Sequence, residues 1–130
     1  MDLNSLSAKI IRAAITVHKE LGPGLLESVY QRSMVIELGK MGTRVKSEVP
    51  VAVFYRGEQV HEEGFRIDLL VEDSIVVEFK SVEEVRNVHK KQLLTYLRLT
   101  KKPLGLLINF NEVLLKDGIT GIINSSTEQV

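Results

Sequence analysis

The sequence of 130 residues contains no cysteine and no tryptophan. The absence of cysteine excludes disulfide bonds, thiolate nucleophiles and thiolate metal sites, and it fits a reducing compartment. No apolar run reaches the ~18 residues that a transmembrane helix needs. The first residues lack a basic segment followed by an apolar one, so we expect no secretory signal. These absences predict a cytoplasmic protein with no membrane partner.

The chain also lacks a net charge, because Lys plus Arg and Asp plus Glu both total 17. A strongly basic protein would indicate a polyanionic partner, so any contact with nucleic acid must come from a local patch. Four Phe and three Tyr are few for a surface that stacks single-stranded bases. The length and the 44% hydrophobic content fit one domain over residues 1–130. We expect its core at about 6–124 and a frayed tail at 125–130.

The hydrophobic pattern predicts a mixed α/β (α+β) fold with helices packed on a sheet. Apolar residues at three- and four-residue spacing predict three helices, at residues 5–21, 25–40 and 82–101. Alternating or continuous apolar residues predict six strands, at residues 49–55, 65–71, 75–79, 104–110, 112–116 and 119–123. The predicted order is therefore ααβββαβββ.

Two of these strands form a hairpin with acidic residues inside it. Alternation predicts that the loop 72–74 joins them, so that Leu69 faces Val77 and, on the other face, Asp68 faces Glu78. Four apolar residues of the first strand are expected to share one face of the sheet: Phe65, Ile67, Leu69 and Val71.

Directly opposed carboxylates, with Cβ atoms about 5 Å apart, repel each other and destabilise the strand pair. Lys80 lies on the same face as Glu78 and relieves part of this repulsion. A divalent cation such as Mg²⁺ or Mn²⁺, which prefers oxygen ligands, would relieve far more. The alternative is a solvated face on which these residues form a weak surface cluster. Leu70 and Val76 on the same face argue against full exposure.

Polar residues also interrupt the apolar side of the helix 82–101. A rotation of 100° per residue places His89, Gln92 and Tyr96 within the inward arc, where they would line the same cleft as the acid pair. The alternative is that they bond to the backbone at the border of the core. Glu27 has a structural explanation, because a carboxylate in the first turn of a helix is favoured by the helix dipole. Tyr30, three residues later, would commonly be a core residue.

Three motifs resemble those of a known group of enzymes. Asp68 followed by Glu78-Phe79-Lys80 resembles the Asp…(Asp/Glu)-X-Lys signature of the PD-(D/E)XK nuclease superfamily, with Ile67 in place of the proline. Gln92-Leu-Leu-Thr-Tyr96 is similar to the Q-x-x-x-Y motif of one of its branches. Gly24-Leu-Leu-Glu27-Ser-Val-Tyr30 resembles the defining motif of the small GxxExxY proteins of that superfamily.

The resemblance implies a restriction-endonuclease-like core and a Mg²⁺- or Mn²⁺-dependent nuclease whose partner is nucleic acid, with DNA favoured over RNA. It also implies roles for individual residues, which we take as predictions. The metal-site residues are Glu27, Asp68, Glu78 and the backbone carbonyl of Phe79. The catalytic residues are Asp68, Glu78, Lys80 beside the attacking water, and the pair Gln92 and Tyr96, with His89 and Tyr30 as accessory candidates.

Two other functions compete with the nuclease. One is an inactive nuclease-like module that binds nucleic acid or a protein without cleaving it. The other is a structural or assembly protein whose hairpin acids face solvent. A chain this short has little room for a specificity domain, which is compatible with a homodimer or a partner protein.

Overall fold

A computed structural model describes residues 2–125, without the side chains of residues 62–64. Nine elements follow one another along this part of the chain: α1 (Leu3–Leu21), α2 (Glu27–Lys40), β1 (Val45–Tyr55), β2 (Glu58–Val71), β3 (Ile75–Lys80), α3 (Asn87–Thr100), β4 (Leu104–Asn109), the 3₁₀ helix η1 (Leu115–Gly118) and β5 (Ile119–Ile123). The predicted mixed α/β class is confirmed. The predicted tail lies outside the described residues, apart from residue 125. No described helix has the length and apolar character needed to cross a membrane.

The strands form one five-stranded mixed sheet in the order β1-β2-β3-β4-β5. β3 and β4 are parallel and are connected through α3, whereas the other neighbours are antiparallel. The predicted strand at 112–116 is wrong, because the chain turns there and enters η1. At Gly118 the chain passes close to the end of β4. A methyl group added at this residue would collide with the Asn109 backbone oxygen, so the close approach requires glycine.

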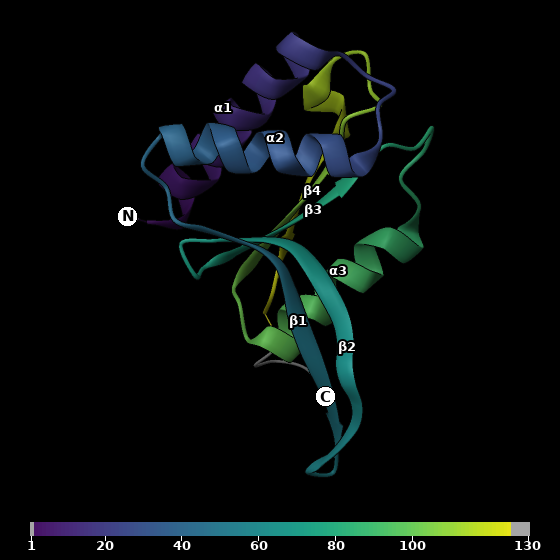
Figure 1. Cartoon of the computed structure of the whole chain (residues 1–130). Coiled ribbons are helices and arrows are strands. Elements are labelled where there is room, and N and C mark those ends of the chain that lie inside the picture. Colours follow the sequence, from purple (N-terminus) through teal and green to yellow (C-terminus); the bar gives the residue numbers. More distant parts are fainter. Residues whose placement is uncertain (1, 126–130) are drawn as a thin grey trace.

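Helices cover both faces of the sheet (Figure 1). On one face α1 and α2 pack on the sheet through a cluster that includes Ile10, Met34 and Phe79. On the other face α3 contributes Leu93 and Leu97 to a second cluster. Because β3 and β4 are covered on both sides, they contain uninterrupted apolar runs, Ile75–Val77 in β3 and Leu106–Ile108 in β4.

The long β1–β2 hairpin bends within its length, and Figure 1 shows the two strands curving together past α3. Leu69 belongs to the cluster under α1 and α2, but Ile67 belongs to the cluster under α3. The ring of Phe65 lies 5.7 Å from that of Tyr96 on α3. The expectation that Phe65, Ile67, Leu69 and Val71 share one face is therefore wrong, because the apolar positions change sides at Asp68.

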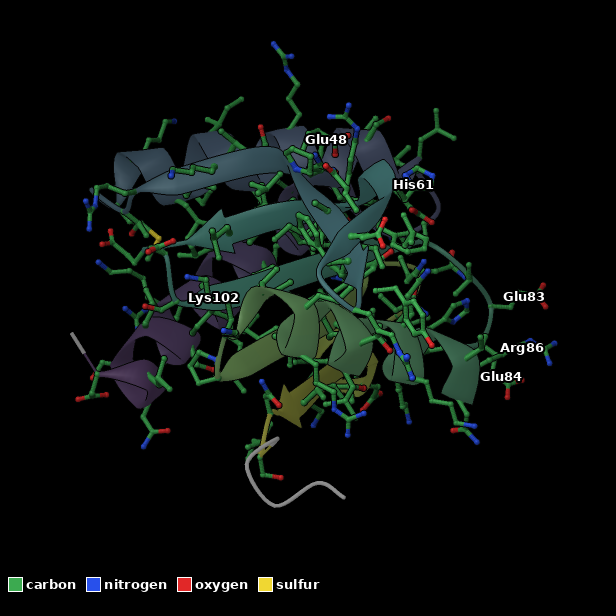
Figure 2. All side chains as sticks on the ribbon, turned by 90° about the horizontal axis from the view of Figure 1, so that it is seen from below. Glu48, His61, Glu83, Glu84, Arg86 and Lys102 are labelled. Atoms are coloured by element: carbon green, nitrogen blue, oxygen red, sulfur yellow. The ribbon has the colours of Figure 1, made fainter. Side chains whose placement is uncertain are left out.

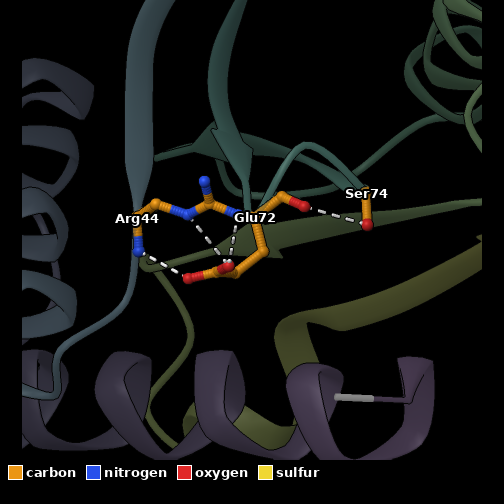
Figure 3. Close-up of polar contacts among 3 residues, drawn as sticks. All are labelled: Arg44, Glu72 and Ser74. Atoms are coloured by element: carbon orange, nitrogen blue, oxygen red, sulfur yellow. Dashed lines mark hydrogen bonds and ion pairs between the residues drawn. The ribbon is translucent and has the colours of Figure 1, made fainter.

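The turn between β2 and β3 is hydrogen-bonded to Arg44, the residue that precedes β1 (Figure 3). The Glu72 carboxylate accepts the Arg44 backbone N–H at 2.7 Å and the guanidinium at 3.2 Å, and the Ser74 hydroxyl donates to the Glu72 carbonyl at 3.0 Å. The exposed ion pair contributes little by itself. The turn occupies residues 72–74 as predicted, and it sets the register that brings Asp68 and Glu78 together.

Candidate active site

Asp68 and Glu78 face each other at the point where the β2–β3 pairing ends. Leu69 pairs with Val77 as predicted, and this is the last regular pair on that side. Beyond it, Glu78 Oε2 accepts the Asp68 backbone N–H at 2.7 Å, and Asp68 Oδ2 accepts the Phe79 backbone N–H at 2.8 Å. At this point the two carboxyl groups take the place of the backbone hydrogen bonds between β2 and β3. Each carboxyl group is held by a backbone N–H of the opposite strand. The predicted juxtaposition is confirmed.

Burial makes the ionised forms of both acids unfavourable. Only 9% of Glu78 is exposed, and its burial, together with the nearby charge of Asp68, raises the pKa of Glu78 to about 8. Burial also raises the pKa of Asp68 to about 6, although the bond from the Phe79 N–H acts in the opposite direction. The alternative of acids facing solvent is therefore wrong. Mutual repulsion and desolvation favour a proton or a cation between them.

Lys80 ends β3 and brings a positive charge to the acid pair. Its charge lowers the pKa values of both Asp68 and Glu78, against the larger effect of burial. The Lys80 carbonyl accepts the Phe110 N–H at 2.9 Å, and the next hydroxyl, that of Ser81, donates to the Leu25 carbonyl at 2.6 Å. The end of β3 is therefore fixed to β4 and to the loop before α2.

That loop places the start of α2 near the acid pair. Glu27 is the first residue of α2 and is exposed, and its charge contributes to the raised pKa of Asp68. Tyr30 is fully buried, as expected for a core residue. Its hydroxyl donates to the Gly22 carbonyl at 2.5 Å and accepts the Leu25 N–H at 3.0 Å. Tyr30 therefore shapes the loop that leads to Glu27.

The three polar residues of α3 have different surroundings. Tyr96 is buried in the cluster that contains Ile67 and Leu70, on either side of Asp68, and its pKa is raised by burial and by the charges of Glu78 and Asp68. Gln92 is exposed, so its expected place in the inward arc is wrong. His89 Nδ1 accepts the Arg86 backbone N–H at 3.0 Å, as the backbone-bonding alternative proposed. The helix begins at Asn87 because residues 82–86 form the connection from β3.

One acidic residue of this region, Glu48 on β1, is not marked by any of the sequence motifs. It lies between the paired positions Ser47–Leu69 and Val49–Ile67, and therefore opposite Asp68. Its charge contributes to the raised pKa values of both Asp68 and Glu78. No local motif marks Glu48, because its position depends on how β1 and β2 pair.

The carboxylates do not form a compact group of three. Among the side chains that the structure describes, no three His, Asp or Glu residues are close enough together to hold a metal ion. Asp68 and Glu78 are consequently the central pair, with Glu27 and Glu48 around it. The carbonyl of Phe79 remains a predicted ligand, while its side chain is buried in the core.

One comparison with known proteins gives a match. A family model described as the PD-(D/E)XK nuclease superfamily matches residues 4–122. No curated protein and no solved structure matches the chain. The mixed sheet flanked by helices is consistent with a restriction-endonuclease-like fold. The narrower assignment to the GxxExxY proteins stays a prediction.

Proposed function

The chain belongs to the PD-(D/E)XK nuclease superfamily, and on this basis we propose that it is a metal-dependent nuclease that hydrolyses phosphodiester bonds of nucleic acid. The observation that carries the proposal is the buried acid pair, Asp68 and Glu78, with the charge of Lys80 beside it. Hydrolysis of a phosphodiester requires stabilisation of negative charge on the phosphate and an activated water. An acid pair that holds a cation, together with an amine, can meet both requirements.

The donors of the acid pair fit a divalent cation. Mg²⁺ is commonly bound by one or two carboxylates together with waters and substrate phosphates. Asp68 and Glu78 each use one oxygen for a backbone N–H, and each has a second oxygen. A cation between them would also offset the repulsion that raises their pKa values. When bound, Mg²⁺ or Mn²⁺ would supply Lewis-acid polarisation of the phosphate and a water of lowered pKa.

The other predicted site residues would complete the reaction centre. We propose that Lys80 orients or deprotonates the attacking water, or stabilises negative charge on the phosphate. The variant Lys80→Arg separates these roles, because it retains the positive charge but is a poor base. Tyr96 would position the acid pair or the substrate, and Gln92, at the surface of α3, would contact the substrate. The Phe79 carbonyl would be a further ligand for the cation, and Glu27, which forms no compact group with the acid pair in the described part of the chain, would contact the cation through a bound water.

A cleavage screen with single- and double-stranded DNA and RNA, in Mg²⁺ or Mn²⁺, tests the proposal. We expect cleavage, of DNA before RNA, that EDTA abolishes. Asp68→Asn should remove activity, and Lys80→Ala should lower it by about a hundredfold or more, the usual size of an acid–base contribution. Lys116→Ala, at an exposed residue of η1, should cleave like the wild type.

Circular dichroism should show that each variant is folded. Undiminished metal-dependent cleavage by both Asp68→Asn and Lys80→Ala would exclude these residues as the active site. We propose further that a second copy or a partner protein supplies target selection, and sedimentation with and without nucleic acid would detect the second copy.

The second candidate is a nuclease-like module that binds nucleic acid or a protein without cleaving it. The observation in its favour is that the described side chains include no compact group of three metal-binding residues. Binding of nucleic acid by a protein that neither binds Mn²⁺ in calorimetry nor cleaves any substrate of the screen would favour this module over the enzyme.

A further inference from the structure

Glu48 lies in one row with the two central acids. The pairs that flank it place Glu48 opposite Asp68 on β1 and β2, and Glu78 follows on β3. Paired strands are about 4.8 Å apart, which is the spacing of β1 and β2 at Glu48 and Asp68, whereas Glu78 is joined to Asp68 by side-chain bonds beyond the last β2–β3 pair. Figure 2 shows Glu48 on β1, the edge strand of the sheet, with α2 behind it.

The backbone and a neighbour on α2 fix the position of Glu48. Its φ of 54° lies in the left-handed region, which is uncommon for a residue with a side chain. The residue is exposed, and Gln31 Nε2 donates to Glu48 Oε2 at 2.7 Å. Gln31 thus binds one carboxylate oxygen of Glu48, and it lies one helical turn after Glu27 on the same side of α2.

The electrostatic effect of Glu48 reaches both central acids. The charge of Glu48 raises the pKa values of Asp68 and of Glu78. Glu48 is nevertheless not part of a compact ligand group among the described side chains. A carboxylate outside the direct ligand group can interact with a cation through a coordinated water, because Mg²⁺ usually keeps several waters.

We propose that Glu48 is a further binding residue of the cation site, contacting the water shell of the ion from β1 while Asp68 and Glu78 bind the ion directly. This inference rests on the proposed function. Gln31 is then a positioning residue that directs the Glu48 carboxylate. Partners of this kind, which do not touch the metal, typically change metal affinity by about ten- to a hundredfold when they are removed.

Calorimetric titration with Mn²⁺ in the absence of nucleic acid tests the inference. Glu48→Gln keeps an oxygen that can accept the Gln31 bond but removes the charge. We expect its Kd for Mn²⁺ to rise by about tenfold or more. Glu58→Gln is the matched control, because it removes the same charge from an exposed residue at the far end of the same hairpin, and its Kd should be unchanged.

Two further arms separate the alternatives. In high salt, where the screening length falls to about 3 Å, the Glu48 effect should persist, whereas a general charge effect would disappear. Asp68→Asn should abolish binding. If Glu48→Gln binds Mn²⁺ like the wild type and Asp68→Asn does not, the Glu48 inference is wrong and the proposed function stands. If the wild type does not bind Mn²⁺, both are overturned.

Discussion

At the scale of single residues, backbone N–H groups hold Asp68 and Glu78 at positions where burial makes the ionised form of each carboxyl group unfavourable. The Asp68 and Phe79 amides donate to the two carboxyl groups, and these bonds favour the ionised forms. Burial outweighs them and raises both pKa values. Without a cation, the folded protein therefore holds protons that the unfolded chain would release.

This imbalance predicts a pH dependence of the stability of the metal-free protein. The folded-state pKa values are about 6 for Asp68 and about 8 for Glu78, above the usual values of 3.8 and 4.5. The folded state binds more protons than the unfolded state between about pH 4 and pH 8, so the free energy of unfolding falls as pH rises through that range. Since each factor of ten in proton affinity corresponds to about 1.4 kcal/mol, we expect a loss on the order of a few kcal/mol.

Urea denaturation in EDTA, from about pH 5 to about pH 8.5, measures this loss. The double variant Asp68→Asn and Glu78→Gln has no such titration, so its stability should depend less on pH than that of the wild type. Parallel pH profiles for the two proteins would show that the acid pair is not strained in the folded state.

At the scale of elements, the short loop between α1 and α2 is hydrogen-bonded to Ser81, the residue that follows β3. Leu25 is held on both sides, with its N–H bonded to the Tyr30 hydroxyl and its carbonyl bonded to the Ser81 hydroxyl. The Tyr30 ring stacks on Phe110 with centroids 4.3 Å apart, which anchors the arrangement in the core. The distance between Glu27 and the acid pair therefore depends on Tyr30.

Removal of the Tyr30 hydroxyl should loosen this connection. Tyr30→Phe keeps the stacked ring but leaves the Leu25 N–H and the Gly22 carbonyl without this partner, which should cost about 1–3 kcal/mol of unfolding free energy. Tyr55→Phe, at a residue that is 64% exposed, should change stability by less than about 0.5 kcal/mol. Chemical denaturation compares them, and equal effects would contradict a structural role for the Tyr30 hydroxyl.

At the scale of the whole molecule, the candidate site lies where elements from both faces of the sheet meet. α2 provides Glu27 from one side, α3 provides Tyr96 from the other, and the β1–β2 bend provides Glu48 at the edge. A cation bound there would connect elements that otherwise pack on separate clusters. Its binding should therefore stabilise the entire fold.

Thermal unfolding should detect this stabilisation. An ion present at a hundred times its Kd contributes about 2.7 kcal/mol to a folded state that alone binds it. We expect Mn²⁺ to raise the Tm of the wild type by several degrees, reversibly with EDTA, and to leave that of Asp68→Asn unchanged. An equal rise in both proteins would indicate that Mn²⁺ binds elsewhere.

Local patterns predicted much of the fold and of the acid pair. The turn at 72–74 and the Leu69–Val77 register follow from alternation, because the side-chain period of a strand is two residues. The exposure of Gln92 was not predictable in this way, because α3 buries only part of the arc that its sequence suggests. The false strand at 112–116 arose because an apolar segment also suits a turn with Leu115 in the core.

The sequence by itself determined which acids oppose each other across the short hairpin, since two adjacent strands and their turn carry all the information. The place of Glu48 was decided only by the tertiary structure. Counting back from the pair Tyr55–Glu58 without interruption would put Glu48 opposite Phe65, but irregularities in the β1–β2 pairing shift the register so that it faces Asp68. Bulges of this kind depend on how the bent hairpin packs against α3, which no local pattern encodes.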